Sequence, residues 1–532
     1  GSGTHLLKNI LLANNNVSGS FTLQGSALYV AGAGSVSIVN CTIAHNSGGP
    51  ALYRYSSNVS VINSILWRNA PSDYANMAQN AFSNSCCLAL TPDVQGNIAS
   101  DPQFETPLWY LKSSSPCIDA GAGNSVSVGL SALTTQTNGT PDAGVVDMGY
   151  HYSGGLGVDK VLFVQPDGND ANNGLAPGPA TALRSITRAI QLAGKRTLIN
   201  VAAGSYTNGQ ETFPLLISRK TIQIKGSGAE QTVIDATNAN MRVISIISSA
   251  GDNRIENISI CNGKLSTGYG GGLYIRDSVL TLKNANISRN RGYGAGGGIY
   301  SEYSRGIISN GRFEKNTAYI GADQWSYGGG LFLYYGAWSV YNSIIVSNQA
   351  PALSAQGGGI YLISGVHDLR NVLFANNLIS GSFTLQGSAI FAGGRSLIEI
   401  INCTAANNTG DSALYKYWDG TVSVLNSIFW NNISSDFANM SAGTITYSCS
   451  ASLTHGISGN ITNNPLFSDA TRQNYHLSTK EGQRSPCINT GSNQLWMATS
   501  CDLDGNQRIA ERYVDMGAYE ALTGVGTMII VN

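Results

Sequence analysis

Short runs in which apolar and polar residues alternate cover most of the chain, and Gly, Asn or Ser separates one run from the next. Alternation with a period of two is typical of β-strands, and Gly and Asn accept the positive φ angles of tight turns. A Gly-rich turn followed by an aliphatic and an aromatic residue recurs through the second half. It appears as GGGLY at Gly270, GGGIY at Gly296, GGGLF at Gly328, GGGIY at Gly357 and GSAIF at Gly387.

A second recurrence lies between these turns and begins with asparagine. Its members start at Asn257, Asn284, Asn342, Asn371, Asn402 and Asn426. The spacings of both patterns fall near 24 to 32 residues, except for the step from Asn284 to Asn342, which is two repeats long. One such unit cannot bury its own apolar side, but stacked coils can. The pattern therefore predicts a β-solenoid over residues 5–85 and 197–450, with ladders of Asn and of aliphatic side chains along the stack.

A much longer repeat shows that the chain contains a duplication. The string SGSFTLQGSA occurs at Ser18 and again at Ser380, and Val-Asp-Met-Gly occurs at Val146 and at Val514. Residues 1–153 therefore repeat residues 363–521. We predict that 1–153 is the C-terminal part of a β-helix module, that 154–521 is a complete module, and that 522–532 is a linker with the first strand of a further module or an assembly strand.

Composition excludes several classes of protein. Charged residues make up 11% of the 532 residues and the net charge is -1, so the chain lacks the basic face that nucleic-acid binding needs. Hydrophobic residues make up 42%, far more than a disordered chain carries. Since no run of about 18 apolar residues occurs, we expect no membrane span.

The stretch LFVQPDGNDANNG from Leu162, followed by INVAAGSYT and IQIKGSGAEQTVIDA, resembles the opening of right-handed β-helix proteins of the pectate-lyase-like superfamily. The later NSIFWNN, NITNNPLFSD, RSPCINTG and VDMGAYE resemble the C-terminal block of bacterial surface β-helix proteins, and polymorphic outer-membrane proteins share the repeat style. The resemblance implies an all-β, right-handed parallel β-helix at the cell surface or outside the cell, in agreement with the general handedness of parallel crossovers. It does not imply an activity, because the superfamily holds lyases, hydrolases, adhesins and fibres.

A short helix is expected between the two modules. Ile186, Ala189, Ile190 and Ala193 fall on one side of a helix over residues 182–194, and Gly194 follows as a stop. In the resembling proteins such a helix closes the N-terminal end of the solenoid. Here it would lie at the junction between two β-helices.

The resemblance directs attention to charged side chains on neighbouring coils. A lyase of this superfamily needs acidic calcium ligands and an Arg or Lys base, and a pectin hydrolase needs paired Asp residues. The charges of the middle coils fall at different places in the repeat. His367, Asp368 and Arg370 form the densest cluster, which is either a set of solvated loop charges or a catalytic group.

Two oxygen-rich loops are candidates for calcium. They contain Asp167, Asn169 and Asp170 in the first loop, and Asp502, Asp504 and Asn506 in the second. Calcium accepts clustered carboxylate and amide oxygens on short loops, but Asp and Asn also favour ordinary turns. The second loop lacks the distant Glu of an EF-hand and has no counterpart in the first module.

Aromatic residues follow the Gly turns once per coil and should form a column. The column contains Tyr274, Tyr300, Phe332, Tyr361, Phe391 and Tyr415. A period of two puts the preceding aliphatic residue inside the coil and the aromatic outside. Tyr274, Tyr300, Phe332 and Tyr361 then form either a carbohydrate-binding strip or a stack that only supports the structure.

Cysteines recur at equivalent places in both modules. Cys449 matches Cys86, and Cys487 matches Cys117, which predicts the disulfides Cys449–Cys487 and Cys117 with Cys86 or Cys87. Cys501 occurs only in the second module and competes for Cys487. Oxidised pairs would favour an extracellular location. The other thiols sit in strand patterns and are expected to be buried and free; they are Cys41, Cys261 and Cys403.

The leading hypothesis is a non-enzymatic surface or filament-forming β-helix protein with a structural or adhesive role. The alternative is a protein that binds or cleaves polysaccharide, as a lyase or a glycoside hydrolase. Residues 524–532 resemble residues 156–165, the start of a module. We therefore expect the chain to contact itself head-to-tail or to join further modules, with the C-terminal strand adding to the exposed first coils of the next chain.

Overall fold

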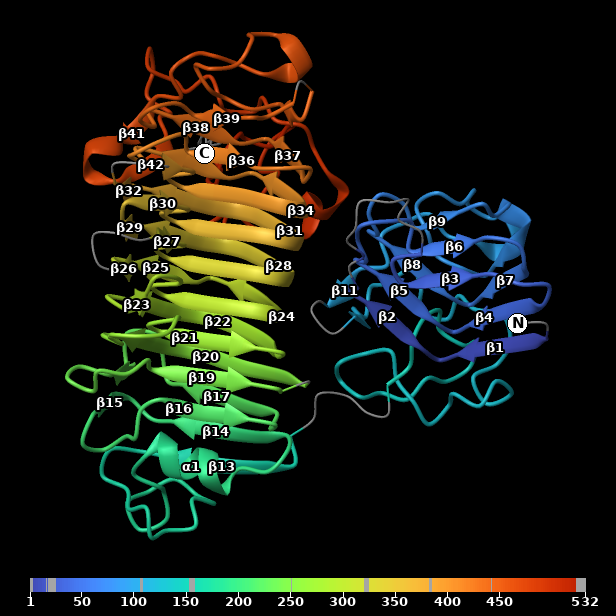
Figure 1. The fold of residues 1–532 in the computed structure, drawn as a ribbon, viewed down its shortest axis with the longest axis horizontal. Coiled ribbons are helices and arrows are strands. Elements are labelled where there is room, and N and C mark those ends of the chain that lie inside the picture. The colour runs from blue at the N-terminus through green and yellow to red at the C-terminus, as the bar shows by residue number, and fades with distance from the viewer. Residues whose placement is uncertain are drawn as a thin grey trace, which may run out of the picture.

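The structure, a computed structural model, describes residues 3–15, 17, 25–105, 109–152, 158–249, 251–319, 325–381, 385–441 and 443–522. It contains two parallel β-helices that lie side by side (Figure 1). The fold predicted from the repeat pattern is therefore confirmed. No helix among the described residues is long and apolar enough to span a membrane.

The first β-helix has three parallel sheets. One consists of β1 (Thr4–Lys8), β4 (Ser35–Val39), β7 (Asn58–Ile62) and β10 (Phe82–Ser83). The second consists of β2 (Leu11–Ala13), β5 (Thr42–Ala44) and β8 (Ile65–Trp67), and the third of β3 (Leu28–Val30), β6 (Leu52–Arg54) and β9 (Tyr74–Ala75). Each strand pairs with the strand one coil away, so the sheets run along the stack.

The second β-helix begins at β13 and is much longer. Its main sheet consists of β13 (Lys160–Val164), β14 (Thr197–Val201), β15 (Gly204–Thr207), β16 (Leu215–Ser218), β17 (Ile222–Gly226), β18 (Thr232–Asp235), β19 (Ile244–Ile247), β20 (Asp252–Cys261), β21 (Leu273–Arg276), β22 (Val279–Ser288), β24 (Ile299–Ser309), β25 (Arg312–Glu314), β28 (Leu331–Val346), β31 (Ile360–Ala375), β34 (Ile390–Ile401), β35 (Thr404–Ala406), β36 (Leu414–Lys416), β37 (Thr421–Leu425), β38 (Ile428–Trp430), β39 (Phe437–Ala438) and β40 (Ile445–Thr446). Two smaller sheets consist of β23 (Arg291–Tyr293), β26 (Thr317–Tyr319), β29 (Gln349–Pro351) and β32 (Leu378–Ser380), and of β27 (Trp325–Tyr327), β30 (Ser354–Gln356) and β33 (Leu385–Gln386).

A C-terminal block of turns follows the last coil of each β-helix. These blocks contain the antiparallel pairs β11 (Phe104–Glu105) with β12 (Tyr110–Leu111) and β41 (Phe467–Asp469) with β42 (Asn474–Leu477). The short 3-10 helices are η1 (Gln79–Ala81), η2 (Val94–Gly96), η3 (Ile457–Gly459), η4 (Ala470–Arg472) and η5 (Leu495–Thr499).

Helix α1 (Ile186–Leu192) closes one end of the second β-helix. Ser185 precedes it, and its side chain accepts a hydrogen bond from the Arg188 amide, as an N-cap residue does. Ile186 and Ile190 are buried in the main core cluster. The predicted helix is therefore present, but the first β-helix lies beside the second instead of stacking on this capped end (Figure 1).

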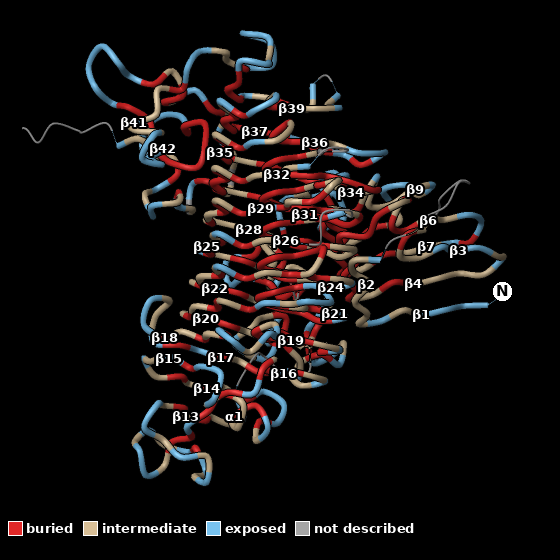
Figure 2. The backbone as a smooth tube through the Cα atoms, turned by 60° about the vertical axis from the view of Figure 1, so that its left-hand side comes forward, coloured by how far each residue is buried: buried red, intermediate tan, exposed pale blue. Residues whose placement is uncertain are grey.

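Aliphatic ladders fill the interior of the second β-helix. One of them consists of Leu162, Ile199, Ile224, Ile255, Leu282, Ile308, Val340, Leu369, Ile400, Val424 and Ile445, each in register with the next. All of them belong to one buried cluster. Buried residues accordingly run through the stacked strands, while exposed stretches gather in the loops at the two ends (Figure 2).

A second ladder is polar and equally buried. It consists of Asn290, Asn316, Asn348, Asn377, Asn408 and Asn432, and it ends on the carboxylate of Asp436. In each step the Oδ1 atom of one asparagine accepts hydrogen bonds from the backbone amide and the Nδ2 of the previous one. The first β-helix repeats the arrangement with Asn15, Asn46 and Asn69, ending on Asp73.

A third set of asparagines holds the C-terminal blocks against the coils. Asn40 and Asn402 occupy left-handed turns, and their Nδ2 atoms donate to the carbonyl oxygens of Asp147 and Asp515 at 3.1 and 3.0 Å. Asn426 donates in the same way to Ser492 of the second block at 2.9 Å. Each block therefore packs along the side of its own β-helix.

Residues 524–532, which carry the expected assembly strand, lie outside the described residues. Head-to-tail association through them stays a prediction.

Replacement of Asn348 by Ala tests the buried polar ladder. The change leaves the Phe313 carbonyl and the Asn316 amide groups without partners in the interior. Unpaired buried groups cost about 1–3 kcal/mol each, so we expect the free energy of unfolding to fall by about 3 kcal/mol or more in urea denaturation. Ser423→Ala on the exposed side of β37 is the control, and it should change stability by less than about 0.5 kcal/mol. Equal effects of both variants would contradict the role of the ladder.

Candidate functional site

His367 lies in the interior of the second β-helix. It is in register with Trp338 and Ile398, which belong to the main core cluster, and it is 1% exposed. Neither ring nitrogen has a hydrogen-bond partner among the described residues. Burial lowers the pKa of His367 to about 3, so the ring is neutral at physiological pH. A side chain enclosed in this way cannot reach a substrate.

Asp368 and Arg370 point the other way, out of the same strand. Arg370 Nε donates to Asp368 Oδ1 at 2.8 Å, and Arg370 Nη2 lies 2.7 Å from Asp368 Oδ2. The Tyr341 hydroxyl, on the neighbouring strand β28, donates to the same carboxylate at 3.0 Å. The indole of Trp496 from the C-terminal block lies 4.7 Å from the Arg370 guanidinium, in cation–π contact.

The first β-helix supplies the remaining partner of this cluster. Arg68 follows β8, and its guanidinium lies 3.5 Å from Asp368 and 3.2 Å from Glu399. Arg68, Asp368, Arg370 and Glu399 thus form one group with two positive and two negative charges, which we call the contact cluster. His45, beside it in the first β-helix, is buried and its pKa is lowered to about 3 by burial, with the charges of Arg68 and Arg370 adding to the effect.

The geometry of the contact cluster fits a contact between domains better than a catalytic centre. Asp368 is 4% exposed, and both of its oxygens accept hydrogen bonds from Tyr341 and Arg370. A general base must reach the proton that it removes, and this carboxylate has no open side. Sequence reasoning identified Asp368 and Arg370 but missed Arg68, which is 300 residues away in the chain.

The oxygens of the first calcium-candidate loop already have partners within the chain. Asp170 accepts hydrogen bonds from the backbone amides of Arg184 and Ser185, both at 2.9 Å, and so fixes the start of α1. Asn169 Oδ1 accepts the amide of Ala171, and Asp167 accepts from Gln165 Nε2. These oxygens are used in turns, and calcium binding by this loop stays a prediction.

The second loop is arranged around Asp502. Its Oδ1 accepts the amides of Asp504 and Asn506 at 3.0 and 2.7 Å, and its Oδ2 accepts the amide of Glu520 at 2.7 Å. Asp504 is paired with His476 at 2.5 Å. Asp502 therefore ties the loop to the end of the block, and calcium binding here also stays a prediction.

A buried ionisable group in the first block was not found by the sequence analysis. The ligand atoms of Asp142, Asp147 and His151 lie within 4.8 Å of one another, and no other such group occurs in the described parts of the chain. His151 Nε2 lies 2.7 Å from Asp142 Oδ2, and Nδ1 lies 3.0 Å from the Gly149 carbonyl. The 2.7 Å separation is that of a hydrogen bond, so one proton is shared between His151 Nε2 and Asp142 Oδ2.

The second block shows which role this group has. Arg508 is fully buried there, and its Nη2 donates to the carbonyl of Gly517, the counterpart of the Gly149 carbonyl, at 2.7 Å. Its Nε lies 3.6 Å from Glu520, whose other oxygen accepts the Asp515 amide. Burial raises the pKa of Glu520 to about 8. Both blocks therefore fix the Val-Asp-Met-Gly turn with a carboxylate and a basic side chain, so His151 takes the structural place of Arg508.

The aromatic column forms a continuous stack on the outside of the coils. The successive ring centroids of Tyr274, Tyr300, Phe332, Tyr361, Phe391 and Tyr415 lie 5.7, 4.9, 4.7, 4.5 and 6.0 Å apart. The aliphatic neighbours Leu331 and Leu333 lie in the interior cluster, while the rings form a cluster of their own. Each ring covers the next, so the flat surfaces of Tyr300, Phe332 and Tyr361 are not open to a sugar.

Other aromatic side chains beside this stack are exposed. Tyr303 and Tyr335 stack on successive coils with centroids 5.6 Å apart, and Tyr303 is 56% exposed. Tyr417 stacks against Trp418, which is 68% exposed. The sequence analysis did not name these residues, because they follow the regular column position by two or more residues.

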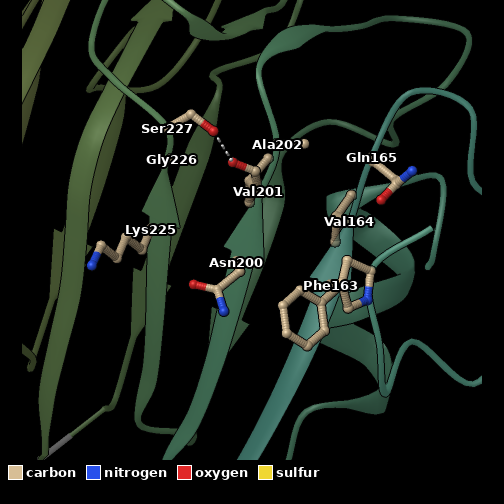
Figure 3. Close-up of a pocket in the computed structure, with 10 residues that line it drawn as sticks. Phe163, Val164, Gln165, Asn200, Val201, Ala202, Lys225, Gly226 and Ser227 are labelled. Atoms are coloured by element: carbon tan, nitrogen blue, oxygen red, sulfur yellow. Dashed lines mark hydrogen bonds between the residues drawn. The ribbon is translucent and has the colours of Figure 1, made fainter. Parts of the chain in front are cut away.

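A small hollow lies at the start of the second β-helix, on the outside of β13, β14 and β17 (Figure 3). Phe163, Asn200 and Lys225 are in register along it, and the Ser227 hydroxyl donates to the Val201 carbonyl at its rim. Its volume of about 170 Å³ is below the range of roughly 300–1,000 Å³ that is usual for ligand pockets. Lys225 is the one ionisable side chain among the residues that line the hollow.

Fold and site together define a right-handed parallel β-helix protein whose densest charged group joins two solenoids. The family model described as "Protein of unknown function (DUF1565)" matches residues 166–449, and the chain belongs to this family. Among curated proteins, none matches the sequence.

Three solved structures are similar to the chain at low identity. Pectate lyase Pel9A is 15% identical with a TM-score of 0.35, covering 69% of this chain and 98% of its own. A rhamnogalacturonan lyase is 11% identical with a TM-score of 0.36, covering 63% and 97%. Pectin methylesterase from Yersinia enterocolitica is 16% identical with a TM-score of 0.28, covering 49% and 95%.

Replacement of His367 by Leu tests its neutral, buried state. Because the folded pKa of about 3 lies below the unfolded value of about 6.5, the unfolded chain binds the proton first. The native state therefore loses stability as pH falls from about 6.5 towards 3, by about 2 kcal/mol at pH 5. The variant should lose this part of the pH dependence, measured as its difference from the wild type in urea unfolding between pH 4.5 and 8. A constant difference across that range would contradict the assignment.

Charge exchange tests the contact cluster. Arg68→Glu brings a third carboxylate to Asp368 and Glu399, so the two β-helices should separate and the radius of gyration from small-angle X-ray scattering should rise. Glu399→Arg in the same chain restores opposite charges and should return the wild-type value. Arg472→Glu is the control, because this side chain is 87% exposed and away from the cluster. Unchanged scattering for Arg68→Glu would show that the charges do not hold the contact.

Proposed function

We propose that this protein is a non-enzymatic β-helix protein of the cell surface or extracellular space, with a structural or adhesive role. The observation that carries the proposal is the contact cluster. The densest group of acid and base side chains on the long strands, which would be the natural place for catalysis, is taken up by the contact with Arg68 of the first β-helix. Because the first β-helix covers these side chains, a substrate has no room to bind beside them.

Rigidity supports the same proposal. Continuous ladders of apolar and asparagine side chains run from coil to coil, so each coil is fixed by both of its neighbours. The contact cluster then joins two such rods through four balanced charges, of which Asp368 and Arg370 are largely buried. Two rigid β-helices joined in this way are suited to a scaffold that holds a binding surface in a fixed shape.

Polysaccharide binding is a second candidate function, and the exposed aromatic side chains favour it. Tyr and Trp rings with one open surface and a polar edge are suited to contacts with sugars, which have both apolar and polar surfaces. Trp418 with Tyr417, and Tyr303 with Tyr335, offer such rings on the outside of the second β-helix. The adhesive role and the carbohydrate-binding role are then two aspects of one surface.

A polysaccharide panel tests both candidates on the full chain. Acidic and neutral polysaccharides are incubated with the protein, and unsaturated products are followed by ultraviolet absorbance and new reducing ends by a colorimetric assay. We expect neither product. Retardation in gels that contain each polysaccharide measures binding, and Trp418→Ala and Tyr303→Ala should weaken any retardation several-fold.

The matched control for the aromatic variants is Tyr447→Ala, which removes an exposed ring outside these two pairs. Product release that survives repurification would overturn the non-enzymatic role. Retardation that is equal in all variants would place the binding elsewhere and contradict the aromatic surface.

A further inference from the structure

Two pairs of cysteines meet at equivalent places in the two halves of the molecule. Cys86 and Cys117 are fully buried in one cluster, and their thiols lie within hydrogen-bonding distance of each other. Cys449 and Cys487 form the same pair in the second half. All nine cysteines of the chain are described, and all of them carry free thiols in the structure.

We infer that Cys86–Cys117 and Cys449–Cys487 are sites of disulfide formation, each of which ties a C-terminal block to the last coil of its β-helix. Cys86 forms parallel bridges with Ile65 of the last full coil and with Ile98 of the block. Cys449 forms the same two bridges, with Ile428 and Ile461. A bond from Cys86 or Cys449 therefore joins the end of the solenoid to the turn that contains Ser115-Pro-Cys117 or Ser485-Pro-Cys487.

The comparison of the two halves explains why Cys87 is not the partner of Cys117. The thiol of Cys87 lies 3.3 Å from Asp73 Oδ2, at the end of the buried asparagine ladder. In the second half the residue at this place is Ser450, and its hydroxyl donates to the equivalent carboxylate of Asp436. Cys87 therefore takes the place of Ser450 as the group beside the aspartate. The residue before it, Cys86 or Cys449, carries the thiol that pairs with the C-terminal block.

The remaining cysteines have no thiol partner in the structure. Cys41 and Cys403 are also equivalent, and their thiols lie 3.5 Å from the carbonyl oxygens of Leu7 and Leu369 inside the coils. Cys261 lies 3.7 Å from the Ile234 carbonyl. Cys501 is exposed and is the one cysteine that the first half lacks. Its backbone carbonyl bonds to Asn371, and it does not join the cluster of Cys487.

Formation of each bond is an exchange with a low-molecular-weight disulfide such as oxidised glutathione. The two protein thiols lose two protons and two electrons, one S–S bond forms between them, and the oxidant is reduced to two thiols. Attack requires a thiolate, and the hydrogen bond to Cys117 together with burial raises the pKa of Cys86. The folded protein should therefore react slowly, and the bonds should form while the blocks are still docking.

The test is a thiol map of the full chain, folded in the presence of oxidised and reduced glutathione. The protein is denatured without reductant and alkylated, and each cysteine is assigned by peptide mass spectrometry. We expect five alkylated residues, which are Cys41, Cys87, Cys261, Cys403 and Cys501, and linked peptides for Cys86–Cys117 and Cys449–Cys487. Reduction before alkylation should label all nine.

Two variants separate this pairing from an accidental one. Cys117→Ser should free Cys86 for alkylation and leave Cys449–Cys487 linked. Cys87→Ser, which copies Ser450, should leave the whole pattern unchanged. Nine alkylated residues in the wild type, or fragment spectra of the linked peptides that place a bond on Cys87 or Cys501, would overturn the inference. If Cys117→Ser does not fold, the wild-type map alone decides, and neither result depends on the adhesive role proposed above.

Discussion

The stacked turns of a parallel β-helix place backbone amides and carbonyls in its interior, and each of them must find a partner there. The buried asparagine ladder supplies partners of this kind. Asn348, for example, accepts from the amide groups of Asn316 and donates to the Phe313 carbonyl of the coil before it, and it also donates to Asn377 of the coil after it. The ladder works only if every coil repeats the same residue at the same place. Between Asn290 and Asn432 this chain of hydrogen bonds thus supports the coil spacing and strand register, alongside the aliphatic ladder that already begins at Leu162.

The duplication shows which features of the ladder system are essential and which are exchangeable. Both ladders end on an aspartate, Asp73 or Asp436, but the donor beside it is a cysteine in one half and a serine in the other. The turn of each C-terminal block is fixed by a base on a carbonyl, which is His151 in one half and Arg508 in the other. The required element is the hydrogen-bond geometry, and different side chains can provide it.

Sequence periodicity predicted the coils and the capping helix, because these depend on residues that repeat at fixed spacing. It failed to place His367, since the stretch His-Asp-Leu-Arg has the composition of a loop while β31 continues through it as a strand of 16 residues. It also missed Arg68, whose partners are far away in the chain. Residues that form contacts between the two β-helices do not recur at a fixed spacing in the sequence. They come together only when the two β-helices pack against each other.

The side-by-side packing brings four charged side chains of two β-helices together in the contact cluster. Other ion pairs on the coils, such as Arg254 with Asp252 and Arg312 with Glu314, join residues of one β-helix only. At the contact cluster, charges are acceptable because Arg68 and Arg370 are balanced by Asp368 and Glu399, and a buried carboxylate such as Asp368 would be costly without them. Arg68 and Glu399 form their 3.2 Å ion pair only across the two β-helices, and both would lose this partner if the contact opened for a substrate. The charges of the contact cluster must stay paired to hold the two β-helices together, and this pairing leaves none of them open to a substrate.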